Sequence, residues 1–486
     1  MSAERHVERK VVVLGAGPAG LSTGYALALA GWQVEVYEQL PQVGGLARTV
    51  EHHGFRFDLG GHRWFTKKDE LNAFLIDVLG DELIWVDRTS RIYFDGKFVD
   101  YPLKMGNVLG EIGPVTGARA IGDFVLAKAQ QTLSQKPIRS MEDAYVAQFG
   151  RTLYELFFRR YSEKLWGESC DQLSGDWVTQ RSKGMSLLTT VKDALKKNND
   201  AQVESLIEKF MYPAHGYGRI SERMAESIAA NGGQVHTGYR VVEARHDGKR
   251  LRSIVVSDGR NEELIEGDAF VSSIPMTELA RILRPGAGPH ILAATEQLTY
   301  RDLVTVHLEL NREQVTSDTW VYVHDPRVSF ARLHEPKNWS PALAPAGQTS
   351  LVLEVFCEAG DQVWQTSDEG LCELVTRDLA AYLNFIEPKD VIGGFAVRLR
   401  DAYPRYGLDY RPAVDAIKSH LRTFANLQIV GRGGTFRYNN ADHAVETGLL
   451  AARNLLGEET IDIDTVNSAN EYLEERRRPA TATAAL

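Results

Sequence analysis

The chain has 486 residues, of which 43% are hydrophobic and 25% charged, as in ordinary globular proteins, and this length favours about two to four domains. The net charge of −10 leaves no basic footprint for nucleic acid, and three scattered cysteines indicate neither a disulfide framework nor a metal site. The first ten residues are polar and charged without the apolar region of a signal peptide, and no run approaches the ~20 apolar residues that a membrane span needs, so we expect a cytoplasmic protein.

The segment from Lys10 to Gly24 predicts a dinucleotide cradle. Four apolar residues predict a strand, a Gly-x-Gly-x-x-Gly turn follows, and small residues then continue at helical spacing. The cradle residues are Gly15, Gly17, Pro18, Ala19 and Gly20. A second strand ends at Glu38, where a carboxylate can bind ribose hydroxyls. The alternative is a glycine-rich turn of an unrelated α/β protein.

Two further glycine pairs follow the cradle. Gly44, Gly45 and Leu46 precede Arg48, which suits the second half of a dinucleotide longer than NAD. Gly61 directly precedes His62, as in a loop that contacts a cofactor, although a turn with a solvated histidine has the same pattern. We also predict a helix over 69–79 and a hairpin of strands 91–94 and 97–99.

Helical spacing of apolar residues predicts an inserted helical lobe over 105–210. The lobe contains adjacent arginines, Arg159 and Arg160, among Phe, Tyr and Trp residues. The arginines fit either a solvated helix face or a partly buried anion site.

Residues 275–397 alternate with period two in segments such as 303–308 and 320–323, which predicts a domain with an antiparallel sheet. The chain then returns to the first domain through a strand and Gly-Arg turn at 427–432 and a helix over 444–455. We therefore predict an α/β protein with a Rossmann-like dinucleotide-binding domain (1–104, 211–274 and 398–460) and a C-terminal extension (461–486).

These motifs together resemble a flavoprotein with two dinucleotide-binding regions, and more finely the UDP-galactopyranose mutase family, in its longer eukaryotic-type branch. The resemblance runs from Val11 to about Leu456. It implies FAD, bound also by a closing motif with Gly431, Arg432, Asp442 and His443. It assigns catalytic roles beside the flavin and the substrate diphosphate to His62, Arg159, Arg332, Tyr403, Tyr438 and Asn440.

The resemblance also implies a substrate pocket formed by Tyr101, Lys104, Tyr161, Trp166, Trp320 and Tyr322. Two positions depart from the family pattern. Lys104 stands where the branch has a glutamine near the base, and Trp339 stands where a substrate tyrosine is expected. A lysine is a point charge, so it reads a nucleobase differently from an amide.

The implied activity is a mutase that interconverts pyranose and furanose forms of a nucleotide sugar. Reduced FAD supplies N5 as the nucleophile, the diphosphate leaves and returns, and no net electrons move. NADPH or NADH is the expected reductant, bound in the substrate cleft because no separate nicotinamide motif is present. The expected partner is therefore a nucleotide sugar, and the sequence allows an oligomer.

Two other functions share the first and last motifs. A net-redox flavoenzyme of the amine oxidase or protoporphyrinogen oxidase type would use a more apolar pocket, whereas paired arginines suit an anion. A binding protein like the Rab GDP-dissociation inhibitors would have lost the flavin, but the intact cradle glycines, Glu38 and Arg48 argue against this.

Overall fold

A five-stranded parallel sheet forms the dinucleotide-binding part of the computed structural model, which describes residues 9–101, 113–134, 137–182 and 209–467. Its strands lie in the order β20 (Leu427–Ile429), β13 (Ala269–Ser272), β1 (Lys10–Leu14), β2 (Gln33–Glu38) and β9 (Gln234–Thr237). All four neighbouring pairs are parallel. The sheet confirms the predicted Rossmann-like fold and joins segments that are far apart in the sequence.

Strand β1 is apolar on both faces because both are covered. Val11 and Val13 pack in a core with α1 (Pro18–Leu29), α10 (Arg219–Ala230) and α17 (Ala441–Leu456). Val12 and Leu14 belong to a second core that also contains the other covering elements. These are β10 (Arg240–His246), β11 (Leu251–Ser257), β12 (Glu262–Glu266), β14 (Leu283–Arg284), α11 (Met276–Ile282), α12 (Pro289–Gln297) and α15 (Tyr410–Leu421).

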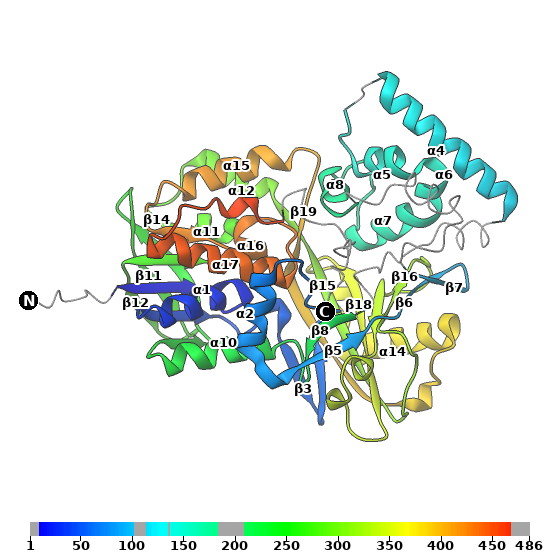
Figure 1. Cartoon of the computed structure of the whole chain (residues 1–486), viewed down its shortest axis with the longest axis horizontal. Helices are drawn as coiled ribbons and strands as arrows, with labels where there is room; N and C mark the ends of the chain where they lie inside the picture. Colours follow the sequence, from blue (N-terminus) through cyan, green and yellow to red (C-terminus); the bar gives the residue numbers. More distant parts are fainter. Residues whose placement is uncertain (1–8, 102–112, 135–136, 183–208, 468–486) are drawn as a thin grey trace, which may run out of the picture.

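A seven-stranded sheet forms the second layer, beside the first (Figure 1). Its order is β19 (Val391–Arg405), β15 (Thr299–Leu310), β18 (Thr349–Cys357), β17 (Arg332–His334), β16 (Trp320–Val323), β6 (Ser90–Phe94) and β7 (Lys97–Asp100). Neighbours are antiparallel except β16 and β6, which are parallel. Helices α13 (Gln362–Gln365) and α14 (Asp368–Asp378) follow β18, and α14 packs against β15 and β19.

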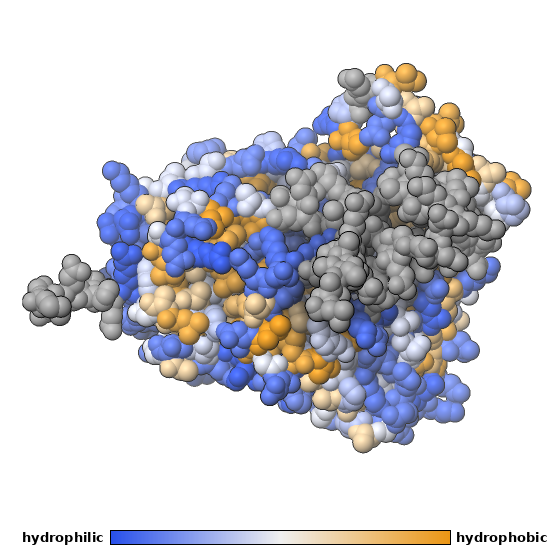
Figure 2. All heavy atoms as spheres, viewed as in Figure 1, coloured by the Kyte–Doolittle hydropathy of each residue, from blue (hydrophilic) through white to orange (hydrophobic). Residues whose placement is uncertain are grey.

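The helical lobe lies against the seven-stranded sheet, at the upper right of Figure 1. It comprises α4 (Pro114–Ser134), α5 (Met141–Phe149), α6 (Arg151–Leu153), the π-helical turn η3 (Tyr154–Arg159), α7 (Arg160–Trp166) and α8 (Asp176–Ser182). Figure 2 shows apolar side chains gathered on this lobe, and those of Val115, Val125 and Leu126 on α4 are exposed. Among the helices of the described ranges, none is both long and apolar enough to cross a membrane.

Two predicted domain boundaries are wrong, because strand pairing over long distances decides them. Strands β6 and β7 form the predicted hairpin, yet they extend the seven-stranded sheet and not the FAD-binding part. Conversely, α11 and α12 lie within 275–397 but pack with α15 beside the parallel sheet. The extension is described to Asn467 and contains a short turn, η8 (Ile463–Thr465).

Candidate active site

The predicted cradle joins β1 to α1, and its glycines are needed for three different reasons. Gly15 has φ +97°, and a Cβ there would lie 2.4 Å from Ser273 Oγ. A Cβ on Gly20 would lie 2.1 Å from Gly15 O, so only glycine lets the helix approach the turn. A Cβ on Gly17 meets no atom within 4 Å, which leaves the space that an approaching pyrophosphate needs. Pro18 and Ala19 open α1 at the same place.

Glu38 ends β2 and turns back to the cradle. One carboxylate oxygen accepts the Ala16 N–H at 2.8 Å and the other accepts the Leu40 N–H at 2.9 Å. The second glycine loop packs on the first, since Gly44 donates its N–H to Ala16 O at 2.8 Å. Leu46 lies in the short turn η1 (Gly45–Ala47) between this contact and Arg48.

The Gly-Arg segment near the C-terminus lies against the same cradle. A Cβ on Gly431 would lie 2.8 Å from Ala19 Cβ. The predicted turn is in fact a short helix, α16 (Gly431–Thr435), because Gly433 and Gly434 permit close contact with residues 272–275. Helix α17 follows with buried Asp442 and His443 in its first turn.

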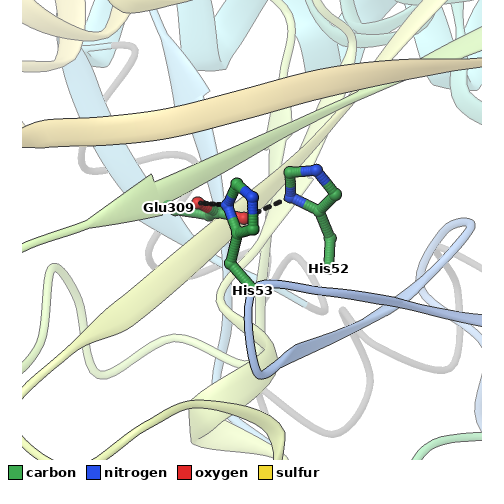
Figure 3. Close-up of side chains that lie close together, drawn as sticks. All are labelled: His52, His53 and Glu309. Atoms are coloured by element: carbon green, nitrogen blue, oxygen red, sulfur yellow. Dashed lines mark hydrogen bonds and ion pairs between the residues drawn. The ribbon is translucent and has the colours of Figure 1, made fainter.

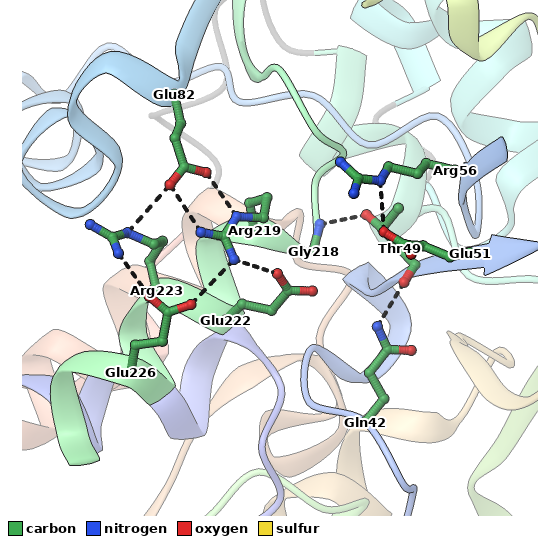
Figure 4. Close-up of polar contacts among 10 residues, drawn as sticks. All are labelled: Gln42, Thr49, Glu51, Arg56, Glu82, Gly218, Arg219, Glu222, Arg223 and Glu226. Atoms are coloured by element: carbon green, nitrogen blue, oxygen red, sulfur yellow. Dashed lines mark hydrogen bonds and ion pairs between the residues drawn. The ribbon is translucent and has the colours of Figure 1, made fainter. Parts of the chain in front are cut away.

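A hairpin of β3 (Thr49–His52) and β4 (Phe55–Asp58) connects the cofactor loop to the cavity. Thr49 donates its hydroxyl to Asp58 at 2.6 Å. The Thr49 hydroxyl also accepts the Gly218 N–H at 2.8 Å, and the Gln42 amide donates to the Thr49 carbonyl at 2.7 Å (Figure 4). Tyr212 also donates to Asp58, at 2.6 Å. Burial raises the pKa of the Asp58 carboxyl to about 6.

A cavity of about 280 Å³ opens where β4 ends, between the seven-stranded sheet and the helical lobe. Eleven predicted site residues line it: Gly61, His62, Tyr101, Tyr161, Trp320, Tyr322, Arg332, Tyr403, Arg432, Tyr438 and Asn440. The remaining polar or charged lining residues that the sequence prediction missed are Arg63, Tyr145, Ser162, Trp177, His324, His334 and Glu354.

Arg332 on β17 is the central cation of the cavity. Its Nη2 donates to Tyr403 Oη at 3.1 Å and lies 2.9 Å from Glu354 Oε2. The sheet register explains this row, because Arg332 lies opposite Tyr322 on one side and Glu354 on the other. Arg332 Nε is buried and has no hydrogen-bond partner among the described residues.

Arg432 also lines the cavity. Its guanidinium donates to the Asn439 carbonyl at 2.9 and 2.7 Å and to the Ala402 carbonyl at 2.9 Å. It also lies 4.9 Å from the ring centre of Tyr403 and 5.1 Å from that of Tyr438. These two rings stack at 5.3 Å, so Arg432 orients the pair of tyrosines.

Three histidines line the cavity and are neutral at neutral pH. Burial lowers the pKa of His62 to about 3, and the nearby Arg432 and Arg332 contribute to this shift. Burial likewise lowers the pKa of His324 and His334 to about 3. The Nδ1 atoms of His62 and His324 are buried without a partner within the described ranges, so both remain available to a ligand.

Arg63 is a second unsatisfied cation in the cavity. Its Nη1 is buried and lacks a partner in the part of the chain that the structure describes. Its guanidinium lies 5.0 Å from the Trp320 ring centre and 5.4 Å from that of Phe65. The one signal for it in the sequence was its place directly after His62 in the glycine-pair loop.

Arg159 does not line the cavity, which corrects the prediction that it faces the substrate diphosphate. Its side chain is 46% exposed and pairs with Glu155 at 3.0 Å and Glu163 at 3.2 Å. The helix period explains this, because Phe158, Tyr161, Ser162 and Leu165 take the cavity face at i, i+3, i+4 and i+7. Arg159 therefore fits the solvated-face alternative.

The other predicted positions lie behind the cavity wall or beyond the described residues. Trp166 is buried, and its ring meets Tyr403 edge-on at 6.4 Å, so it supports a lining residue. Trp339 is also buried and donates its indole N–H to Thr319 O at 2.7 Å. Lys104 lies outside the described residues.

The cradle and the cavity fit one long dinucleotide cofactor. The open space at Gly17 accommodates a pyrophosphate, and Gly61 lines the cavity, where a Cβ on it would have no neighbour closer than 3.8 Å. Asn440 and Ala441 bring the N-terminal end of α17 to the same cavity. A flavin fits this arrangement, since its dinucleotide end needs the glycine loops and its ring needs an adjoining cavity.

Comparison with known proteins agrees with this arrangement. The flavin containing amine oxidoreductase family matches residues 18–456. A 4,4'-diapophytoene desaturase (4,4'-diapolycopene-forming) from Methylomonas sp is 35% identical over 412 residues, which cover 77% of this chain and 79% of the relative. A zeta-carotene-forming phytoene desaturase from Myxococcus xanthus is 22% identical, over 71% of this chain and 72% of the relative.

Among solved structures, reduced UDP-galactopyranose mutase superposes with a TM-score of 0.80 at 23% identity, covering 95% of this chain and 99% of that one. At this identity the superposition shows a shared fold. The family match begins at Pro18, within the cradle, and spans the cavity and α17. The chain therefore belongs to the flavin containing amine oxidoreductase family.

Proposed function

We propose that this flavoprotein is an FAD-dependent mutase that interconverts the pyranose and furanose forms of a nucleotide sugar without net redox change. The observation that carries the proposal is a pair of half-buried arginines in the cavity, Arg63 and Arg332, each with one buried N–H that has no partner among the described residues. A guanidinium with a buried, unpaired N–H suits an anion such as a diphosphate.

The residues around Arg332 suit a leaving group that must depart and return. Glu354 holds Arg332 in place, so its free Nε can point to a ligand without movement of the side chain. Tyr403 and Tyr438 add hydroxyl groups beside it, and Arg432 keeps their rings stacked. Donors that are already oriented stabilise developing charge most effectively.

FAD, held by the cradle and the cavity, would supply in its reduced form a nucleophile for the anomeric carbon. The chain's own part is positioning. His62 is neutral because burial and the two arginines lower its pKa to about 3, so it adds a hydrogen-bonding group to the cavity without adding charge. Trp320, Tyr322 and Tyr161 supply aromatic faces for the nucleoside and sugar.

The mutase requires a reductant, which we propose is NADPH or NADH. We expect it to use the same cavity as the nucleotide sugar, because the described residues contain a single cradle of the Gly-x-Gly-x-x-Gly type. Reduction and sugar binding would then exclude each other.

The second candidate is a net-redox oxidoreductase, which is favoured by the similarity to a desaturase at 35% identity. A polyene substrate needs a long apolar cavity. The lining of this cavity includes three arginines, three histidines and a glutamate, which suits such a substrate poorly.

A turnover assay separates the two candidates. The protein is reduced anaerobically with dithionite, mixed with UDP-galactofuranose or other nucleotide sugars, and sampled by chromatography while the flavin spectrum is recorded. A mutase converts furanose to pyranose while the flavin stays reduced. No conversion of any nucleotide sugar, together with oxidation of the flavin by an apolar acceptor, would establish the redox candidate.

A further inference from the structure

A cluster of two histidines and one glutamate lies at the tip of the β3–β4 hairpin, outside the cavity described above (Figure 3). His52 Nδ1 lies 2.6 Å from Glu309 Oε1, and His53 Nδ1 lies 3.1 Å from Glu309 Oε2. We propose that these three residues bind a divalent transition-metal ion of the Zn²⁺ class.

The ligand atoms have the chemistry and spacing of such a site. Two imidazole nitrogens and one carboxylate are common ligands for Zn²⁺ and its neighbours, with water completing the shell. One potential ligand atom from each residue lies within 4.8 Å of the other two. In a tetrahedral site with bonds of about 2.0 Å, ligands lie roughly 3.3 Å apart, so small side-chain rotations bring them into place.

Burial supports a cation at this position. The Glu309 side chain is only 2% exposed, whereas the side chains of His52 and His53 are 36% and 69% exposed. A buried carboxylate is unfavourable unless a cation or several donors compensate it. The exposed histidines leave a path to water, so an ion can enter and keep a water ligand.

The surrounding backbone makes room for the Glu309 carboxylate. Gly393 lies opposite Glu309 in the β15–β19 pair, and a Cβ at this position would lie 2.3 Å from Glu309 Oε2. On the other side, the His52 ring lies 4.6 Å from the Phe395 ring. The glycine thus directs the carboxylate toward the hairpin, where both histidines converge on it.

The hairpin turn presents the second ligand through an uncommon backbone conformation. His53 has φ +47° and Gly54 has φ +85°, so the turn has two left-handed residues. Asparagine is favoured at the first of these positions. Histidine is also among the non-glycine residues that adopt this conformation most readily, so the turn can place the His53 ring beside Glu309.

A bound ion would fasten the hairpin to strand β15 of the seven-stranded sheet. Strand β4 leads from this tip to Gly60, Gly61 and His62 in the cavity. The ion would therefore stabilise the segment that carries His62. Apart from this mechanical link, the site is independent of the proposed sugar chemistry.

The test measures Zn²⁺ binding by untagged, flavin-loaded protein that has first been stripped with a chelator. Equilibrium dialysis followed by elemental analysis gives the stoichiometry and affinity for wild type, His53→Asn, Glu309→Gln and the control His290→Asn. Asparagine suits the left-handed turn, so His53→Asn keeps the hairpin. His290 is exposed on α12, so its replacement removes a surface histidine elsewhere.

We expect one Zn²⁺ per chain in wild type and in His290→Asn, and an affinity at least about tenfold lower in His53→Asn and Glu309→Gln. Zn²⁺ should raise the Tm of wild type but not that of His53→Asn, since only a folded site binds the ion. Absence of binding in wild type, or equal binding in wild type and His53→Asn, would overturn the proposal. If Glu309→Gln fails to fold, the His53→Asn comparison decides alone.

Discussion

The cofactor cradle and the substrate cavity are built by different means. The cradle depends on backbone geometry within one short segment, where Gly15 and Gly20 permit contacts that no side chain allows. The cavity depends on side chains that separate strands and helices bring together, as in the row of Tyr322, Arg332 and Glu354. Backbone requirements leave a mark in the local sequence, whereas a row across three strands does not.

The difference also separates two kinds of failure. A bulky change in the cradle should remove the flavin and the fold together, because helix α1 packs directly on the turn and on α17. A change in the cavity should leave the flavin bound and alter only what the flavin acts upon. Flavin content and turnover should therefore respond independently to substitutions in the two regions.

The largest effect is expected for Gly20→Val. The new Cβ would lie 2.1 Å from Gly15 O, and overpacking against backbone should lower the free energy of unfolding by about 3 kcal/mol or more. The flavin-to-protein absorbance ratio and the Tm should both fall. Gly17→Ala is the matched control, since its Cβ meets no atom within 4 Å. It should keep the fold and lose flavin affinity alone, and a loss of both properties in Gly17→Ala would contradict the distinction.

The next largest effect is expected for Arg332→Lys. The lysine keeps a charge beside Glu354 but loses the planar donors of the guanidinium. The activation free energy calculated from kcat/KM for the nucleotide sugar should therefore rise by about 3 kcal/mol, with flavin content unchanged. Arg159→Ala should change the same activation free energy by less than about 0.5 kcal/mol, because the Arg159 side chain lies at the surface in exposed ion pairs. An equal loss of kcat/KM in both variants would show that Arg159 does contribute to the active site.

Acidification should lower the stability of the folded protein through the histidines in and near the cavity. Burial lowers the pKa of His62, His324 and His334 to about 3, and that of His307 behind them also to about 3. The unfolded chain binds these protons near pH 6.5 and the native protein does not, so stability falls as pH drops from about 6.5 toward 3. Each histidine contributes at most about 1.4 kcal/mol per pH unit.

Two buried carboxyls, Asp58 and Glu335, oppose this trend because burial raises the pKa of each. The Asp58 carboxyl has its pKa raised to about 6 by burial, so the native protein binds this proton more readily and gains stability as pH falls below about 6. The stability gained from Asp58 on acidification roughly offsets the stability lost from one histidine. Tm measured between about pH 7.5 and 5 should decline, and more gently in His307→Gln. A Tm that rises on acidification would refute the assignment of neutral histidines.

The smallest effect is expected for Tyr403→Phe. The variant loses the hydroxyl that accepts from Arg332 at 3.1 Å but keeps the ring that stacks on Tyr438. A hydrogen bond that involves a charged group contributes about 1.5 kcal/mol, so affinity for UDP should fall by about tenfold. Calorimetric titration with UDP measures this, and a loss of flavin in the same variant would show that Tyr403 also supports the cofactor.

The local elements of this fold were accessible from the sequence. The predicted helix at 69–79 matches α2 (Asp69–Leu79), because Gly80 follows the last apolar residue and ends it. The turn between β6 and β7 was marked by Asp95 and Gly96, which both have positive φ. Such features depend on residues close together in the chain, so single residues reveal them.

The partners of those elements were not accessible. Nothing near Ser90 or Lys97 indicates that β6 pairs with β16, more than two hundred residues later. Likewise, Arg159 and Tyr161 are only two positions apart in the sequence. Because they lie on different faces of the helix, Tyr161 lines the cavity and Arg159 lies at the surface. Arg63 and Glu354 were missed because their significance depends on neighbours across the cavity.

The central claim is that the cavity binds a nucleoside diphosphate through the arginines that line it. Calorimetric titration of UDP into the dithionite-reduced, flavin-loaded protein, compared between wild type and Arg332→Lys, tests this most directly. We predict binding of one UDP per chain in wild type and at least about tenfold weaker binding in the variant. Absence of UDP binding, or equal affinity in both proteins, would contradict it.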